Sequence, residues 1–377
     1  MKRTLDEMTG LRGAAAFLIC LNHTLLLVPA LYQSALSPFL MRCGLLGMSL
    51  FFCLSGFVIY YNYAERLQSS SGLEVIRFFI ARFARVYPLY VIFLLGFTVF
   101  NLIRTQGPHL QANLTALPVF LSCMQSWFFG IINGFQVVHL QGSANISWSI
   151  STEFGLYCLF VPLAFLLKWK KTHVRVLLFT AGMVLLHVAY VQFCHASGVA
   201  EAMASLFSCT PEQTFFHLVN YSPLGRLPEF LAGCGAAMFF DLGIPQEGYP
   251  RMRRVLFAAA FLLVLDSCTW RFFSFPRSDF SLLSLAVVLV VFASVLGRSR
   301  ILSSRVFLFM GNVSYSVYLL HIVFVLLLCY RGERTASMLS TLAVFFPAVY
   351  LCAWLCFRFY EMPCRKKIRT FFNIAKA

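Results

Sequence analysis

Eleven apolar segments, each about 20 residues long, constrain the fold of this chain more than any other feature. An α-helix of that length matches the roughly 30 Å hydrocarbon core of a bilayer. The composition agrees, because 60% of the residues are hydrophobic and only 12% are charged, whereas a soluble domain is about 25% charged. The segments cover residues 11–32, 39–61, 86–103, 114–134, 148–167, 174–194, 224–240, 254–270, 280–296, 308–330 and 337–358. None alternates apolar and polar residues as a membrane β-barrel strand does, so the sequence predicts an all-α, polytopic membrane helix bundle.

Basic residues in the connecting loops indicate which segments cross the membrane. Short cytoplasmic loops are enriched in Lys and Arg, and the basic loops here are 62–85, 168–171, 251–254, 298–305 and the tail 365–367. If all eleven segments cross, loops 62–85 and 168–171 fall on opposite sides. If segment 114–134 does not cross, every basic loop and both termini are cytoplasmic. Pro118 and Gln125 also interrupt this segment, as expected for a re-entrant or interfacial one. We therefore predict about ten transmembrane helices.

The length of 377 residues leaves no room for a large soluble domain beside these spans, so we expect a single domain, 1–377. Its longest outer loop would cover about 195–223.

The net charge of +16 follows the positive-inside pattern, and no basic domain is present to bind nucleic acid. Cys194 and Cys209 flank the outer loop and would pair only if that loop is extracytoplasmic. No C-x-x-C motif is present, so neither a zinc site nor a redox motif is supported, and we expect no metal.

His23 lies in the middle of the first apolar segment, where an ionisable side chain is costly and by default marks a functional site. Arg12 precedes it by eleven residues, about three helical turns, so both side chains are expected on one helix face. At about 1.5 Å per residue, His23 would lie roughly 16 Å deeper in the membrane than Arg12. A single buried histidine is more often structural than catalytic, so the case for His23 depends on its partners.

Arg82 and Arg85 form a second candidate site at the cytoplasmic side. Their i, i+3 spacing places them on one helix face just before Pro88. Paired guanidinium groups suit phosphate recognition, because their planar forks hold phosphate oxygens bidentately. On the residues alone, ordinary positive-inside anchoring is the favoured interpretation, and phosphate binding is the alternative.

Further polar residues are expected at the depth of His23. They are Ser149 and Glu153 in segment 148–167, Arg226 and Glu229 near the start of 224–240, and Asn312, Tyr318 and His321 in 308–330. The first two are spaced i, i+4 and share a face, and the next two are spaced i, i+3, as an ion pair would be. A buried, unpaired charge costs several kcal/mol in lipid. We therefore expect these groups to face one another or a wet cavity.

Six motifs follow one another along the chain. They are residues 10–13 (GLRG) with His23, 47–57 (GMSLFFCLSGF), 79–88 (FIARFARVYP), 148–153 (WSISTE), 226–233 (RLPEFLAG) and 311–321 (GNVSYSVYLLH), with 358–363 (RFYEMP) after them. In this order they resemble the motifs of the acyltransferase-3 family, integral-membrane O-acyltransferases of glycans. Two departures stand out. Ser49 occupies a position where many members carry an acid, and Thr152 and Phe154 flank Glu153 in place of commoner neighbours.

The resemblance implies transfer of an acetyl or other short acyl group from cytoplasmic acyl-CoA to a carbohydrate hydroxyl. It implies functional roles for Arg12, His23, Arg82, Arg85 and Glu153. We expect the three arginines to bind acetyl-CoA, His23 to act as base or as acyl carrier, and Glu153 to orient it. Asn312, Tyr318 or Arg226 would stabilise the oxyanion, and Ser149, Glu229 and His321 are further candidates for the substrate site.

The resemblance also implies a location in the bacterial cytoplasmic (inner) membrane. The chain is expected to be a stand-alone form, without the fused hydrolase-like domain of some members. The alternative is a transporter or flippase of a lipid-linked glycan, which would use a similar polar cavity without depending on acyl-CoA. Neither the carbohydrate acceptor nor the oligomeric state follows from the sequence.

Overall fold

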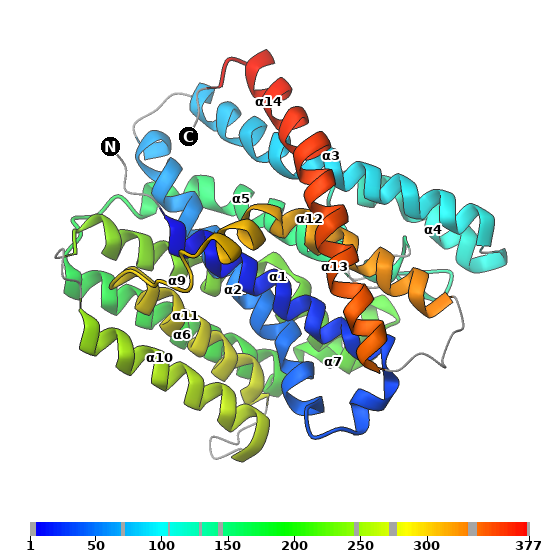
Figure 1. Cartoon of the computed structure of the whole chain (residues 1–377), viewed down its shortest axis with the longest axis horizontal. Helices are drawn as coiled ribbons and strands as arrows, with labels where there is room; N and C mark the ends of the chain where they lie inside the picture. Colours follow the sequence, from blue (N-terminus) through cyan, green and yellow to red (C-terminus); the bar gives the residue numbers. More distant parts are fainter. Residues whose placement is uncertain are drawn as a thin grey trace. The chain divides into compact units, whose positions relative to one another are not determined.

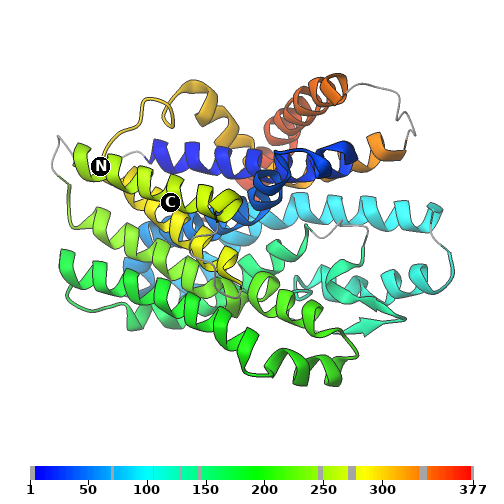
Figure 2. The ribbon, with the colours of Figure 1, turned by 90° about the horizontal axis from the view of Figure 1, so that it is seen from below.

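The computed structural model describes residues 5–68, 72–104, 106–127, 130–141, 146–244, 249–270, 277–330 and 338–374. Almost every element is a helix (Figure 1), which confirms the predicted all-α class. The helices are α1 Asp6–Leu27, η1 Pro29–Gln33, α2 Ser37–Gln68, α3 Gly72–Arg104, α4 Gly107–Leu121, η2 Val137–His139, α5 Trp148–Leu166, α6 His173–Ala196, α7 Val199–Phe207, α8 Pro211–Phe216, η3 His217–Tyr221, α9 Pro223–Asp241, α10 Pro250–Leu265, η4 Asp266–Trp270, α11 Ser278–Val295, α12 Arg305–Tyr330, α13 Met338–Cys356, η5 Phe357–Glu361 and α14 Met362–Phe371. Strand in the described residues is limited to β1 Ile131–Ile132 and β2 Phe135–Gln136 (Figure 2).

Eight helices in the described part of the chain are long and apolar enough to cross a membrane. They are α1, α2, α3, α5, α6, α11, α12 and the helix Ser340–Phe371, which includes most of α13 and all of α14. These helices confirm a polytopic, integral membrane protein. The expected spans 224–240 and 254–270 are also helical, as α9 and α10, although α10 has only 16 residues before it continues as the π-helix η4. The number of ten crossings stays a prediction.

The expected loop over 62–85 is wrong, because helices occupy it. α2 continues to Gln68 and α3 already begins at Gly72, and residues 69–71 lie outside the described residues. Arg82 and Arg85 therefore belong to the interior of α3. The prediction ended each helix where the apolar run meets charges. Arg and Glu are good helix formers, however, and their aliphatic stems pack on apolar neighbours, so the helix continues through them.

Segment 114–134 does not form a spanning helix, as predicted. α4 ends at Leu121, and Cys123 adopts a left-handed backbone with φ 54°. Residues 128–129 lie outside the described residues. The chain then forms the β1–β2 hairpin around Asn133 and Gly134, both with positive φ. An Asn-Gly pair is the strongest short-range signal for such a hairpin, and it was missed in the sequence prediction.

The segment 195–223, predicted as an outer loop, is mostly helical. It contains α7, α8 and η3, and Thr210 closes a capping box with Gln213 at the start of α8. Cys194 and Cys209, at the two ends of this region, are both free thiols in the structure. The predicted loop is thus largely helical, and one capping box stabilises the start of α8.

The contacts divide the chain into two compact units. Unit 1 comprises Met1–Tyr61, Lys171–Leu185 and Glu229–Arg358, and unit 2 comprises Asn62–Lys170, Leu186–Pro228 and Phe359–Ala377. In unit 1, α12 packs against α1 and α13, and α10 packs against α11. In unit 2, α3 packs against α4, α5 and α14, and α4 folds back beside α3 (Figure 2). The single domain over the whole chain stays a prediction.

Glycines allow α1 and α12 to lie very close together within unit 1. A Cβ atom on Gly311 would be 1.9 Å from the carbonyl oxygen of Thr9, and one on Gly13 would be 2.7 Å from the backbone nitrogen of Gly311. No side chain fits at such distances, so only glycine permits this contact. The close approach brings together the helices that carry His23 and His321.

Candidate functional site

His23 on α1 and His321 on α12 face each other in unit 1. Nε2 of His321 lies 3.2 Å from Nδ1 of His23, and the ring centroids are 4.9 Å apart. His321 is fully buried. The structure thus brings together two of the predicted site residues, although they are 298 positions apart in the sequence.

The hydrogen bonds of this pair determine where its protons lie. Nδ1 of His321 is 3.2 Å from the carbonyl oxygen of Val317, and because a carbonyl only accepts, this nitrogen donates. Nε2 of the neutral His321 ring is then an acceptor. Nδ1 of His23 is 2.9 Å from the carbonyl oxygen of Ile19, so it also carries a proton, which it shares between Ile19 and His321. Nε2 of a neutral His23 is therefore unprotonated, which is the form that acts as a base.

Tyr318 extends this cluster, whereas Asn312 does not. The Tyr318 ring centroid is 6.0 Å from that of His321 and 6.0 Å from that of Phe51 on α2. Asn312 is exposed. It precedes His321 by nine residues, which at about 100° per residue places it on the opposite face of α12. The oxyanion role of either residue stays a prediction.

Arg12 has the predicted relation to His23. α1 is continuous from Asp6 to Leu27, so eleven residues place the two side chains on one face, about 16 Å apart along the helix axis. Arg12 is half-buried. A phosphate-binding role for Arg12 stays a prediction.

Arg82 is buried in α3 of unit 2, with only 4% of its surface exposed. Its Nη2 donates to the Tyr63 hydroxyl at 2.6 Å, and its guanidinium lies 4.7 Å from the centroid of the same ring. Its Nε is buried and has no hydrogen-bond partner among the described residues. Arg85 follows one turn later and is half-buried. Surface anchoring does not require such burial, because an anchoring arginine extends its charge into water.

Glu153 on α5 accepts a hydrogen bond from a tyrosine of the same helix in unit 2. The Tyr157 hydroxyl donates to Oε1 of Glu153, and Tyr157 lies within electrostatic reach of Arg82 and Arg85. Tyr157 is buried and follows Glu153 by one helical turn on α5. The sequence prediction missed this tyrosine, although its i, i+4 spacing indicates the contact. The orientation of His23 by Glu153 stays a prediction.

Glu229 on α9 is held by Ser49 on α2. Oγ of Ser49 donates to Oε1 of Glu229 at 2.7 Å, and both side chains are buried. The serine that departs from the acyltransferase-3 pattern thus supplies a donor to a buried carboxylate. An acid at this position would instead have to share a proton with Glu229.

Arg226 and Ser149 have local partners in unit 2. Nε of Arg226 donates to the carbonyl oxygen of Asn220 at 2.8 Å, and Nη2 donates to the side-chain oxygen of the same residue. These bonds hold Arg226 to the π-helix η3. Ser149 donates to the carbonyl oxygen of Ile146 at 3.0 Å. The expected ion pair between Arg226 and Glu229 stays a prediction. The same holds for the proposed roles of Arg226, Glu229 and Ser149 in the substrate site.

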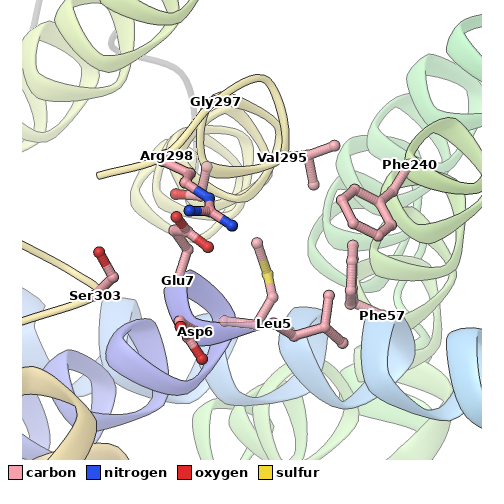
Figure 3. A pocket seen from close by; sticks show the side chains of 11 residues that line it. Leu5, Asp6, Glu7, Phe57, Phe240, Val295, Gly297, Arg298 and Ser303 are labelled. Carbon is pink, nitrogen blue, oxygen red and sulfur yellow. The ribbon is translucent and has the colours of Figure 1, made fainter. Parts of the chain in front are cut away.

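A small pocket of about 60 Å³ lies at the start of α1 in unit 1 (Figure 3). Asp6, Glu7 and Arg298 supply polar groups to its lining, and the backbone N–H of Ser299 donates to Glu7 at 3.3 Å. The two acids also stabilise the positive end of the α1 dipole. No predicted site residue lines this pocket. Among the described residues, no group of three or more His, Cys, Asp or Glu side chains is placed to hold a metal ion.

Comparison with known proteins agrees with the motifs. A family model described as an acyltransferase domain, of the acyltransferase-3 type, matches residues 5–358. The chain is 24% identical over 337 residues to the peptidoglycan O-acetyltransferase OatA of Listeria monocytogenes, which covers 86% of this chain and 51% of OatA. It is 26% identical over 321 residues to the acyltransferase MdmB of Streptomyces mycarofaciens, which covers 84% of this chain and 78% of MdmB. The chain spans about half the length of OatA. No solved structure matches it.

Proposed function

Because the chain belongs to the acyltransferase-3 family, we propose that this membrane-embedded O-acyltransferase takes an acetyl or other short acyl group from cytoplasmic acyl-CoA. The acceptor is a hydroxyl of a cell-envelope or exported carbohydrate, and the location is the bacterial inner membrane. One relative, OatA, is named as acting on peptidoglycan, which supports the carbohydrate class. The family favours this enzyme over a transporter with a similar polar cavity.

The observation that carries the proposal is the His23–His321 pair. Nε2 of His23 takes the proton of the acceptor hydroxyl as its oxygen attacks the thioester carbonyl carbon. The carbon–sulfur bond then breaks, and His23 returns the proton to the departing thiolate of CoA. His321 keeps the proton of His23 on Nδ1, much as a third residue does in a catalytic triad. In the covalent variant, Nε2 of His23 attacks first and then passes the acyl group to the hydroxyl.

The arginines of unit 2 fit the donor. Phosphate groups of CoA need charged, planar donors, and Arg82 offers a buried Nε with no partner among the described residues. Arg85 lies one turn away on the same helix. Arg12 lies toward the predicted cytoplasmic end of α1. With the phosphates of CoA bound by these arginines, the thin pantetheine arm would be free to extend into the helix bundle.

Thiol release tests this function. Purified protein in detergent is incubated with acetyl-CoA and a mixture of cell-envelope glycans, and free CoA thiol is measured with a disulfide reagent. We expect thiol release that depends on the glycan, together with a glycan whose mass increases by one acetyl group. Glycan movement into vesicles without thiol release would support the transporter instead and would refute the enzyme.

A further inference from the structure

A third arginine, Arg365 on the C-terminal helix α14, lies with Arg82 and Arg85 in unit 2. α14 packs against α3 (Figure 1). The Tyr360 hydroxyl, just before α14, donates to the carbonyl oxygen of Pro88 at 3.2 Å and fixes this contact. The charges of Arg85 and Arg82 act on Arg365, whose side chain is half-buried. In the sequence, Arg365 is only the first residue of a basic tail, so this grouping depends on the fold.

The three guanidinium groups carry more positive charge than Glu153 and Glu361, the acids described near them, can balance. Arg82 bonds to a tyrosine, and neither Arg85 nor Arg365 forms a hydrogen bond or salt bridge to a residue that the structure describes. Glu361 alone opposes the repulsion that acts on Arg365. Like charges at close range destabilise one another, and a bound anion compensates them. The cluster therefore has the character of an anion-binding site.

We propose that Arg365 joins Arg82 and Arg85 in one site that binds the phosphate groups of the acyl donor. This inference rests on the proposed function, which supplies acyl-CoA as the donor class. CoA carries a pyrophosphate and a ribose phosphate, so its several charges match three guanidinium forks better than a single phosphate does. The site would thus select acyl-CoA over donors with one phosphate, such as an acyl phosphate or an acylated phosphopantetheine carrier.

The contrast between Arg365 and its neighbour on α14 agrees with this assignment. The neighbouring Lys366 is exposed, whereas Arg365 is half-buried. Lys366 therefore suits general attraction to anionic lipid, which shares the phosphate chemistry, and it provides a matched control with the same change of charge on the same helix.

The test compares R365Q, K366Q and R365K with the wild type in lipid-free detergent. We expect R365Q to raise KM for acetyl-CoA by about 10- to 100-fold, with kcat little changed, because one charged hydrogen bond is lost. R365K should recover part of the affinity, and K366Q should behave as the wild type. Acetyl-dephospho-CoA lacks the ribose phosphate. The ratio of its KM to that of acetyl-CoA should be smaller in R365Q than in the wild type. Elution volume and thermal midpoint report whether each variant is folded.

Several outcomes would overturn the assignment. One is an unchanged KM in R365Q, and another is an equal rise in K366Q, which would indicate bulk charge. A third is a loss of binding to phosphatidylglycerol vesicles in R365Q with KM for acetyl-CoA intact, since that would identify a lipid headgroup as the ligand. If the wild type itself releases no thiol from acetyl-CoA, the proposed function fails first. If the wild type turns over with acetyl-CoA and R365Q binds the donor as the wild type does, this inference alone fails.

Discussion

The contacts of His23 and His321 determine which ring nitrogens carry protons, and the proposed chemistry depends on this arrangement. His23 was predicted as the key residue from its depth in the first apolar segment, and His321 was only one of several polar candidates. Sequence spacing relates residues on one helix, but it does not relate α1 to α12. The contact between the two rings therefore required the fold, as did the contact of Ser49 with Glu229.

Replacing His321 tests its positioning role. In His321→Ala, the proton of His23 is no longer held on Nδ1, so kcat should fall on the order of 10²-fold, with little change in KM for acetyl-CoA. His321→Gln keeps an acceptor oxygen for Nδ1 of His23 and should recover part of the rate. Steady-state kinetics over a pH series measure both variants. Equal rates in His321→Ala and the wild type would contradict the role.

Ser49→Ala tests the support of Glu229. It removes one hydrogen bond to a buried carboxylate, and a hydrogen bond to a charged group contributes about 1.5–3 kcal/mol. We expect a lower thermal midpoint in detergent. Ser284→Ala, at another buried serine of unit 1, is the comparison, and an equal loss there would indicate general packing rather than this bond.

His217, in the predicted outer region, makes stability depend on pH. Burial lowers its pKa to about 4, while its Nε2 donates to the carbonyl oxygen of Ser126 and His139 adds a smaller lowering. An unfolded histidine has a pKa of about 6.5. Above pH 6.5 both states are neutral. As the pH falls from about 6.5 to about 4, only the unfolded chain binds the proton, so stability falls by up to about 3 kcal/mol.

His217→Gln should flatten this dependence, since the amide still donates to Ser126 but does not titrate. Thermal midpoints between pH 7 and pH 4 provide the measurement. His195→Gln, at an exposed position, should keep the slope of the wild type. A slope that is the same in all three proteins would refute the assignment to His217.

The helices themselves were largely predictable, because each follows from a continuous apolar run of sufficient length. Their ends were not, since α2 and α3 extend through charged residues that hydropathy treats as loop. The contacts between helices depend on small residues whose partners are far away in sequence. Gly311 is an example, because the backbone of Thr9, on another helix, leaves no space for a side chain at this position.

Gly311→Ala tests whether the α1–α12 contact sets the site. A Cβ would be 1.9 Å from the Thr9 carbonyl oxygen, so the helices must move apart and the bond between His23 and His321 must lengthen. We expect a loss of both thermal stability and turnover. Gly182→Ala has nothing within 4 Å of the new Cβ and should be neutral or stabilising by up to about 1 kcal/mol. Normal activity in a folded Gly311→Ala protein would contradict this view.

At the scale of the whole molecule, the charge pattern predicts both termini on the cytoplasmic side, where acyl-CoA is found. Single-cysteine variants test this topology in intact cells. Cys209, in the predicted outer region, should react with a membrane-impermeant maleimide from outside, and Cys364, in α14 just before the basic tail, should react only after permeabilisation. Labelling of Cys364 in intact cells would reverse the topology and place the arginines away from the donor.

The central claim is that His23 performs the chemistry, and acetyl transfer by His23→Ala tests it most directly. The variant should insert and elute as the wild type does, while glycan-dependent thiol release from acetyl-CoA falls by about 10²- to 10⁴-fold. His195→Ala, an exposed histidine of α6, should keep the wild-type rate. Full thiol release by the His23→Ala protein would contradict both the base mechanism and the acyl-histidine relay.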